Sequence, residues 1–458
     1  MNVRPAIRNL AIACAIILLP IAAHQLWDYL ELRRLIGEVE SIRARREPVT
    51  EFEAGLGRSP EHGVPQRAGR LYMAAAVLAA NEDYSVYPLV AGVREWLSGA
   101  VASPPAEAQE RLQALLTSSR EALALADEAG TLTFQGFPAG TAYNYRTADL
   151  YSLSRLISAR TIGLAVMGQA EAAMASAISG LRLRHALRDL RWSPGSGDGR
   201  DVPAILSLTQ PAAETLQRLQ AALQADDPDR AVDDVLFDRA RTVEDVWRQY
   251  YGGLPQAPSR YLLPNRSLTE TVMRPWVTRQ TVGTLRAWAE LVEAARTPWP
   301  ARVDVARAMA AKYGGEQVEM TSAPLGPAAA VRRTAMYRRL HAYETFSRIA
   351  RPDDLVSQRA SVAAIAVERY RRDHQGALPG ALQDLVPQYL DAVPQDPVTG
   401  GSLLFKQDSG AYTIYSVGPD KKDDGGDLNS ELLKVIKQGY GVRVVRGADL
   451  GVRVTSIR

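Results

Sequence analysis

Apolar residues dominate the first thirty positions of this 458-residue chain. An unbroken apolar run extends from Leu10 to Ala23, and two basic residues, Arg4 and Arg8, precede it. A basic flank followed by a hydrophobic centre is typical of export signals. The stretch from Ile7 to Leu26 reaches the roughly 20 residues of a membrane span if Arg8 extends toward the lipid headgroups. We therefore expect an N-terminal transmembrane helix.

The cleavage rule for export signals favours retention of this segment. Cleavage after Ala23 would place Ile21 three residues before the cut, and cleavage after Ala22 would place Pro20 there. Neither residue fits the small-x-small pattern, which favours an uncleaved signal-anchor. Because basic residues stay on the cytoplasmic side, we expect a single-pass protein of the bacterial inner membrane with the bulk of the chain in the periplasm.

Helical spacing continues beyond the apolar run as far as Pro48. Apolar residues recur there at steps of three and four, at Leu26, Tyr29, Leu32, Ile36, Val39 and Ile42. We expect residues 1–48 to form a membrane anchor and a helical stem. The apolar stripe either packs on the chain's own body or pairs with another subunit. The second alternative would make the protein a homo-oligomer.

The middle of the chain, residues 49–350, has helical periodicity and little strand-like alternation. Ser103 and Pro104 are a helix start signal, and we expect the helix that they open to end at Gly130. Two apolar helical runs between residues 150 and 190 are separated at Gly168 and resemble one tetratricopeptide-type hairpin. We predict an all-α domain, an irregular helical bundle or solenoid.

Charge and cysteine content narrow the classes of function. Lys and Arg total 54 against 51 for Asp and Glu, a formal net charge of +3, which argues against nucleic-acid binding. Cys14 is the only cysteine, so an intrachain disulfide and a cysteine-based zinc site are excluded. The sequence has no P-loop, no G-x-S-x-G and no H-E-x-x-H motif, and we predict no catalytic residues.

The pattern changes after residue 350. We expect a helix from Asp353 to about Asp373, followed by a short helix and Pro-marked turns. Two strands should follow at residues 403–406 and 412–416. We predict that residues 351–458 form a small α+β domain, which ends in a helix at 432–437 and a hairpin of 442–446 with 452–455. The fold class is mainly α.

An acidic, Gly-rich segment follows the second of these strands. Asp420, Asp423, Asp424 and Asp427 place four carboxylates within eight residues, beside Gly425 and Gly426. Calcium takes six to eight oxygen ligands, and glycines permit the sharp turns that direct several oxygens inward. The alternative is a solvated acidic turn neutralised by two neighbouring lysines. We favour calcium, with Asp424 among the ligands.

The segment Tyr370 to Asp427 resembles the C-terminal globular domain of the major pseudopilin of type II secretion. The shared features are a helix end, two Pro-marked turns, two strands and the loop SVGPDKKDDGGD. The family's last strand leads into a calcium loop, and the resemblance implies a structural Ca²⁺. The matching ligand positions are Ser416, Gly418, Asp420 and Asp427.

The resemblance covers about 60 residues, and the chain departs from the family elsewhere. Residues 1–30 lack the leader with its Gly-Phe-x-x-x-Glu cleavage site, and about three hundred helical residues precede the similar segment. We predict a noncatalytic, membrane-anchored envelope protein that acts in assembly or secretion through protein contacts. The alternatives are a helical peptide- or ligand-binding envelope module and, third, an envelope enzyme.

Overall fold

A computed structural model describes most of the chain, and it is mainly helical with one small sheet. This agrees with the mainly-α class expected from the hydrophobic periodicity. The described residues are 4–50, 53, 67–80, 87–98, 103–137, 147–187, 201–225, 229, 231–246, 268–313, 352–418, 421–428 and 449–455.

The elements fall into two compact units. Unit 1 comprises residues 1–57, 231–297 and 305–349, and unit 2 comprises residues 58–230, 298–304 and 350–458. Unit 1 contains α1 (Arg4–Ala44), α10 (Ala231–Val246) and α11 (Leu268–Arg296). The helix α12 (Ala301–Tyr313) begins in unit 2 and continues in unit 1.

Unit 2 contains the other helices and the sheet. Its helices are α2 (Arg67–Ala79), α3 (Tyr87–Ser98), α4 (Ala108–Ser118), α5 (Arg120–Thr131), α6 (Thr147–Val166), α7 (Ala170–Leu187), α8 (Val202–Leu208), α9 (Ala213–Ala225), α14 (Asp353–Asp373) and the 3₁₀ helix η6 (Leu382–Leu385). Its strands are β1 (Leu404–Asp408), β2 (Ala411–Ser416) and β3 (Leu450–Thr455).

In unit 1, α1 packs along α11, and α11 also packs against α10. The buried face of α1 starts with two carboxylates, Asp28 and Glu31, and continues with Leu35, Val39 and Ile42. Asp28 is held by Arg274 of α11, whose Nε donates to Oδ1 at 2.8 Å and whose Nη2 donates to the second oxygen. The ion pair lets this face turn inward despite the cost of burying a charge.

The expected apolar stripe of α1 is therefore only partly buried. Val39 and Ile42 lie in the core, whereas Leu26 and Tyr29 are 59% and 56% exposed. The reason is the long-range pair between Asp28 and Arg274, because a helix that directs Asp28 inward turns the positions beside it outward.

The predicted N-terminal transmembrane helix is a second correction. Within the described part of the chain, no helix combines the length and the apolar character that crossing a membrane demands.

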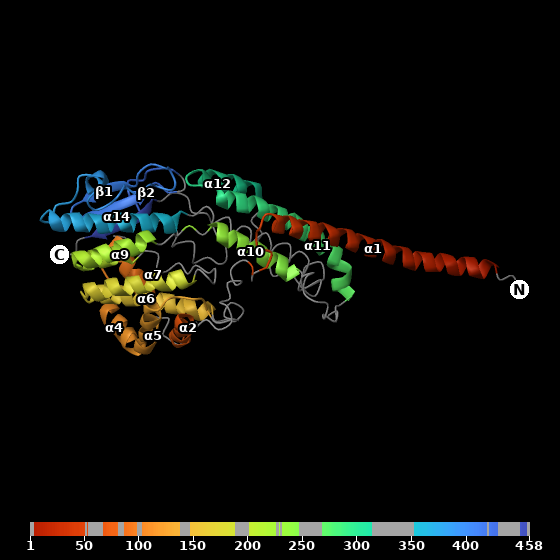
Figure 1. Cartoon of the computed structure of the whole chain (residues 1–458), viewed down its shortest axis with the longest axis horizontal. Coiled ribbons are helices and arrows are strands. Elements are labelled where there is room, and N and C mark those ends of the chain that lie inside the picture. Colours follow the sequence, from red (N-terminus) through yellow and green to blue (C-terminus); the bar gives the residue numbers. More distant parts are fainter. Residues whose placement is uncertain are drawn as a thin grey trace. The chain divides into compact units, whose positions relative to one another are not determined.

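In unit 2, α14 lies between the sheet and the helical layers formed by α9, α7 and α6 (Figure 1). Its residues from Ala363 to Val367 are completely buried, because the sheet covers one side and α9 covers another. Tyr412 of β2 donates from its hydroxyl to the Ala364 carbonyl at 3.2 Å and to Glu368 at 3.1 Å. The helix and both strands expected for this region are present.

The sheet is antiparallel with the order β1-β2-β3. Phe405 pairs with Ile414 in the first ladder, and Ile414 pairs with Val452 in the second. The expected hairpin partner of residues 452–455, segment 442–446, lies outside the described residues, as does the expected helix 432–437. In the structure, residues 452–455 belong to β3 and pair with β2.

Two helical predictions had different outcomes. The predicted hairpin is present as α6 and α7, which end and begin around Gly168 at a positive φ of 72°. The single helix expected up to Gly130 is instead α4 and α5, separated at Ser119. The hydroxyls of Thr117 and Ser118 donate to carbonyls of their own helix, a type of bond that bends or ends helices.

Candidate metal-binding loop

The predicted calcium loop follows β2, the central strand, at one end of the sheet in unit 2. Of the five predicted ligands, Ser416, Gly418, Asp424 and Asp427 are described, and Asp420 lies outside the described residues. Gly418, Gly425 and Gly426 all have positive φ values, between 70° and 77°. These glycines permit the chain to reverse direction around the carboxylates, as the sequence pattern indicates.

Ser416 and Gly418, two of the predicted ligands, belong to a hydrogen-bond network with Asp396, which the sequence pattern does not single out. The Ser416 hydroxyl is buried and donates to Asp396 Oδ1 at 2.6 Å, and the backbone N–H of Gly418 donates back to the Ser416 oxygen at 3.3 Å. Asp396 is 2% exposed and also accepts from the Val398 N–H at 2.8 Å. Ser416 therefore joins β2 to the turn that precedes β1.

Asp423 and Asp424 both have partners near the loop. The Tyr415 hydroxyl donates to Asp423 Oδ1 at 3.1 Å, and the Gly425 N–H donates to the same oxygen at 2.8 Å. Burial, and then the bond to Asp423, raise the pKa of Tyr415 to about 12, so the phenol stays protonated as a donor. Asp424 Oδ1 forms an ion pair with Lys422 at 2.9 Å.

Asp449 lies at the centre of this turn although the sequence pattern does not single it out. It immediately precedes β3, is 2% exposed, and accepts from the Gly426 N–H at 2.7 Å and the Asp424 N–H at 3.3 Å. Burial raises the pKa of Asp449, and the two N–H groups counteract that rise. Its position 22 residues beyond Asp427 and just before a strand is the only local signal that it carries.

The chemistry of the described residues fits calcium in part. Carboxylate and carbonyl oxygens are present, but the Ser416 hydroxyl is engaged by Asp396, and Lys406 Nζ donates to the Gly425 carbonyl at 2.8 Å. Across the described ranges, no three His, Cys, Asp or Glu side chains gather at a spacing that could hold a metal ion. The ligand set predicted from the sequence also needs Asp420, so calcium binding stays a prediction.

No protein-family model matches this chain, and comparisons with curated proteins and with solved structures found no similar protein.

Proposed function

We propose that this chain is a noncatalytic protein of the bacterial cell envelope, which acts in assembly or secretion through protein contacts and uses a calcium-stabilised, pseudopilin-like C-terminal domain. The proposal does not depend on a membrane-spanning helix. The observation that supports it best is the turn at residues 423–427, in which the backbone curls around the buried carboxylate of Asp449 beside β2.

The role that we propose for calcium is structural. Extracellular calcium modules bind with dissociation constants of about 0.1 to 1 mM. At 1 mM calcium, mass action then adds only about 0.4 to 1.4 kcal/mol to the free energy of unfolding. Such a contribution suffices to order a loop that Asp449 and Tyr415 already hold in part.

Thermal unfolding of the full chain tests this role. We expect 1 mM calcium to raise the melting temperature by roughly 1 to 2 °C over a sample with chelator, as the mass-action gain and the size of unit 2 imply. Asp427→Asn should remove the rise, whereas Asp391→Asn, which neutralises an exposed carboxylate before the β1 turn, should keep it. Equal melting temperatures with calcium and with chelator would contradict the metal site.

The assembly role has its own test. Crosslinking in intact cells should recover this chain together with protein partners of the envelope. Recovery of monomers alone, under conditions that crosslink a known envelope complex in the same cells, would count against it.

The alternative of a ligand-binding helical body gains little from the cavity between α6 and α9. Ser158 and Asp201 line it on the polar side, and Leu219 and Leu223 line it on the apolar side. Its volume is about 20 Å³. That space accommodates about one water molecule.

A further inference from the structure

A seven-residue segment, 298–304, belongs by its contacts to unit 2, although the chain before it and after it belongs to unit 1. The segment reads Pro-Trp-Pro-Ala-Arg-Val-Asp. It contacts residues of unit 2 that are far away in the sequence, namely Asp229, Val398, Gly400, Val417 and Lys421. Residues 301–304 of the segment are the first turn of α12, so unit 2 holds a short stretch of chain that leads into a helix.

One end of the segment is held by Asp229. Arg302 is 5% exposed, and its Nη1 donates to the two Asp229 oxygens at 2.7 and 2.8 Å. The Trp299 indole donates to the same carboxylate at 3.1 Å. The Arg302 guanidinium also lies 4.7 Å from the Trp299 ring centroid, within the range of a cation–π contact.

The middle of the segment is apolar. Val303 is 3% exposed and packs with Val398 and Val417 of the C-terminal domain. Pro300 lies against Gly400, where an added Cβ would come within 3.2 Å of the proline Cγ. Gly400 also has a φ of 79°, so both its conformation and its lack of a side chain permit this close approach.

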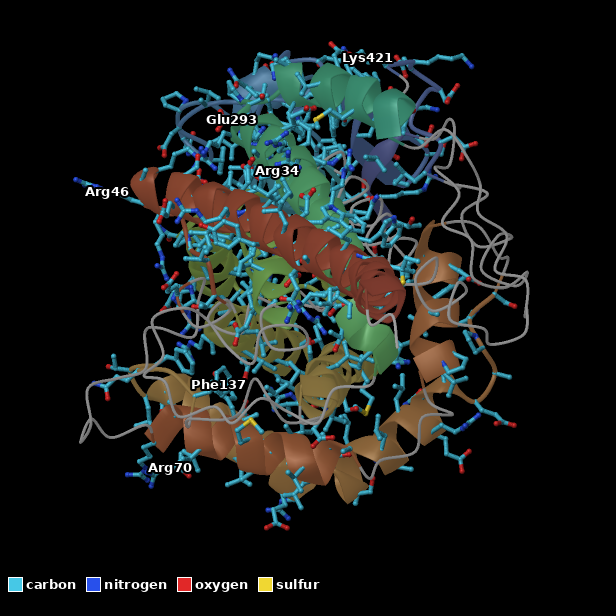
Figure 2. The ribbon with its side chains drawn as sticks, turned by 90° about the vertical axis from the view of Figure 1, so that its right-hand side faces the viewer. Arg34, Arg46, Arg70, Phe137, Glu293 and Lys421 are labelled. Carbon is cyan, nitrogen blue, oxygen red and sulfur yellow. The ribbon has the colours of Figure 1, made fainter. Side chains whose placement is uncertain are left out.

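The other end of the segment, at Asp304, carries a negative charge, whereas Arg302 carries a positive charge. Lys421, marked in Figure 2, donates from Nζ to both Asp304 oxygens at 2.9 Å. Lys421 follows β2 and is one residue beyond the predicted ligand Asp420. The surface thus offers an anion, an apolar centre and a cation, in an order complementary to Arg302, Val303 and Asp304.

We propose that unit 2 carries a docking surface for a short protein segment that leads into a helix, that residues 298–304 occupy it as an internal latch, and that a partner protein with the same chemistry displaces them. The surface consists of Asp229, Val398, Gly400, Val417 and Lys421. The partner segment presents an aromatic residue beside proline, then an arginine, an aliphatic residue and a carboxylate. The proposal that a partner displaces the latch rests on the proposed assembly function, whereas the contact of residues 298–304 with unit 2 does not.

The latch is exposed at its Asp304 end, whereas its Arg302–Asp229 pair is largely buried. Its bonds to Asp229 and Lys421 come from side chains, so undocking leaves the backbone pairing of the sheet intact. The Lys421–Asp304 pair is 37% and 59% exposed, and exposed ion pairs exchange readily with solvent.

A labelled peptide of residues 297–306 tests the surface on the full chain. We expect it to bind the latch-opened variant Trp299→Ala/Arg302→Ala at least tenfold more tightly than the wild-type chain. A matched peptide with Arg302→Glu and Asp304→Lys should not bind. Equal binding of the natural peptide to both chains, or equal binding of both peptides to the opened chain, would overturn the proposal.

If the latch-opened variant does not fold, hydrogen exchange on the wild-type chain tests the latch instead. Excess natural peptide should speed exchange at residues 298–304, and the charge-reversed peptide should not. No change with the natural peptide overturns the latch. Repeating the measurement with calcium and with chelator separates the two proposals, because a chain without a calcium effect still gives the peptide result if the latch is correct.

Discussion

At the scale of single residues, Glu47 is a buried charge of unit 1 with three cationic partners. It lies just beyond the end of α1, next to Arg46, which has a φ of 58° and points away from the ribbon in Figure 2. Arg239 Nη1 and Arg296 Nη2 each donate to the Glu47 carboxylate at 2.7 Å, and Arg45 donates at 3.0 Å. Three cations around one buried carboxylate link the end of α1 to α10 and α11.

Glu47→Gln should destabilise unit 1 by about 3 kcal/mol at pH 7, because Arg239 is completely buried and would lose its counter-charge. Chemical denaturation measures the loss. Glu293→Gln is the matched control, since Glu293 also pairs with Arg296 at 2.7 Å but is 70% exposed, and it should cost less than about 1 kcal/mol. Equal losses in the two variants would contradict this account.

The destabilisation caused by Glu47→Gln should depend on pH. Burial acts to raise the pKa of Glu47, but the bonds from Arg239 and Arg45 outweigh it and hold the pKa below the ordinary value of 4.5. The stabilisation is therefore complete above about pH 4.5 and is lost as the pH falls through the lowered pKa. The stability gap between wild type and Glu47→Gln should narrow only in that acidic range.

At the same scale, the sequence pattern located the acidic loop but not its partners. Asp424 and Asp427 lie in the predicted turn, and the glycines beside them have the backbone conformation that the pattern requires. Asp449 and Asp396 were missed because each approaches the loop through the folded sheet, and not through neighbouring positions in the chain.

At the scale of elements, close backbone approach decides how α2 packs. A Cβ on Gly69 would lie 2.3 Å from the Gly136 carbonyl oxygen and 3.0 Å from the Phe137 Cα. Figure 2 shows Phe137 above α2, the helix that also carries Arg70. The helix can reach this segment only without a side chain at position 69.

Gly69→Ala should therefore destabilise unit 2 by about 1 to 3 kcal/mol, as overpacking does. Gly180→Ala on α7 is the control, because the added Cβ would meet Ile157 at an ordinary 3.4 Å. In a helix interior that change is expected to be neutral or to stabilise by up to about 1 kcal/mol. Urea unfolding of both variants measures their free energies of unfolding. A Gly69→Ala variant as stable as wild type would contradict the prediction.

At the scale of the whole molecule, the end of the chain completes unit 2. β3 pairs with β2 along its length, and Val452 and Val454 are 3% and 1% exposed. The Thr455 N–H donates to the Ser207 hydroxyl at 3.0 Å, and the Thr455 hydroxyl donates to the Leu97 carbonyl at 3.3 Å. These bonds join residues about 250 and 360 positions apart in sequence.

A chain that ends at Ala448 should lose cooperative unfolding of unit 2. Exposing two buried valines alone costs about 3 to 6 kcal/mol, a large part of the 5 to 15 kcal/mol that stabilises a typical domain. Calorimetry and near-UV circular dichroism would detect the loss. A chain that ends at Thr455 keeps β3 and should unfold as the full chain does; equal behaviour of the two truncations would refute the assignment.

The amino-acid sequence by itself determined the helical character of the middle of the chain, the α6–α7 hairpin, and the order of helix, turns and two strands after residue 352. These features follow from hydrophobic spacing and turn residues, which act over a few positions. The break at Ser119 shows the limit of that local rule, because competing side-chain bonds ended a helix whose pattern continued.

Only the tertiary structure decided which face of α1 is buried, that Asp449 enters the acidic turn, and that residues 298–304 dock on unit 2. Each outcome depends on a partner far along the chain: Asp28 with Arg274, Gly426 with Asp449, and Arg302 with Asp229. A buried charge is stable only beside its counter-charge or donors, and local periodicity does not specify where in the chain that partner lies.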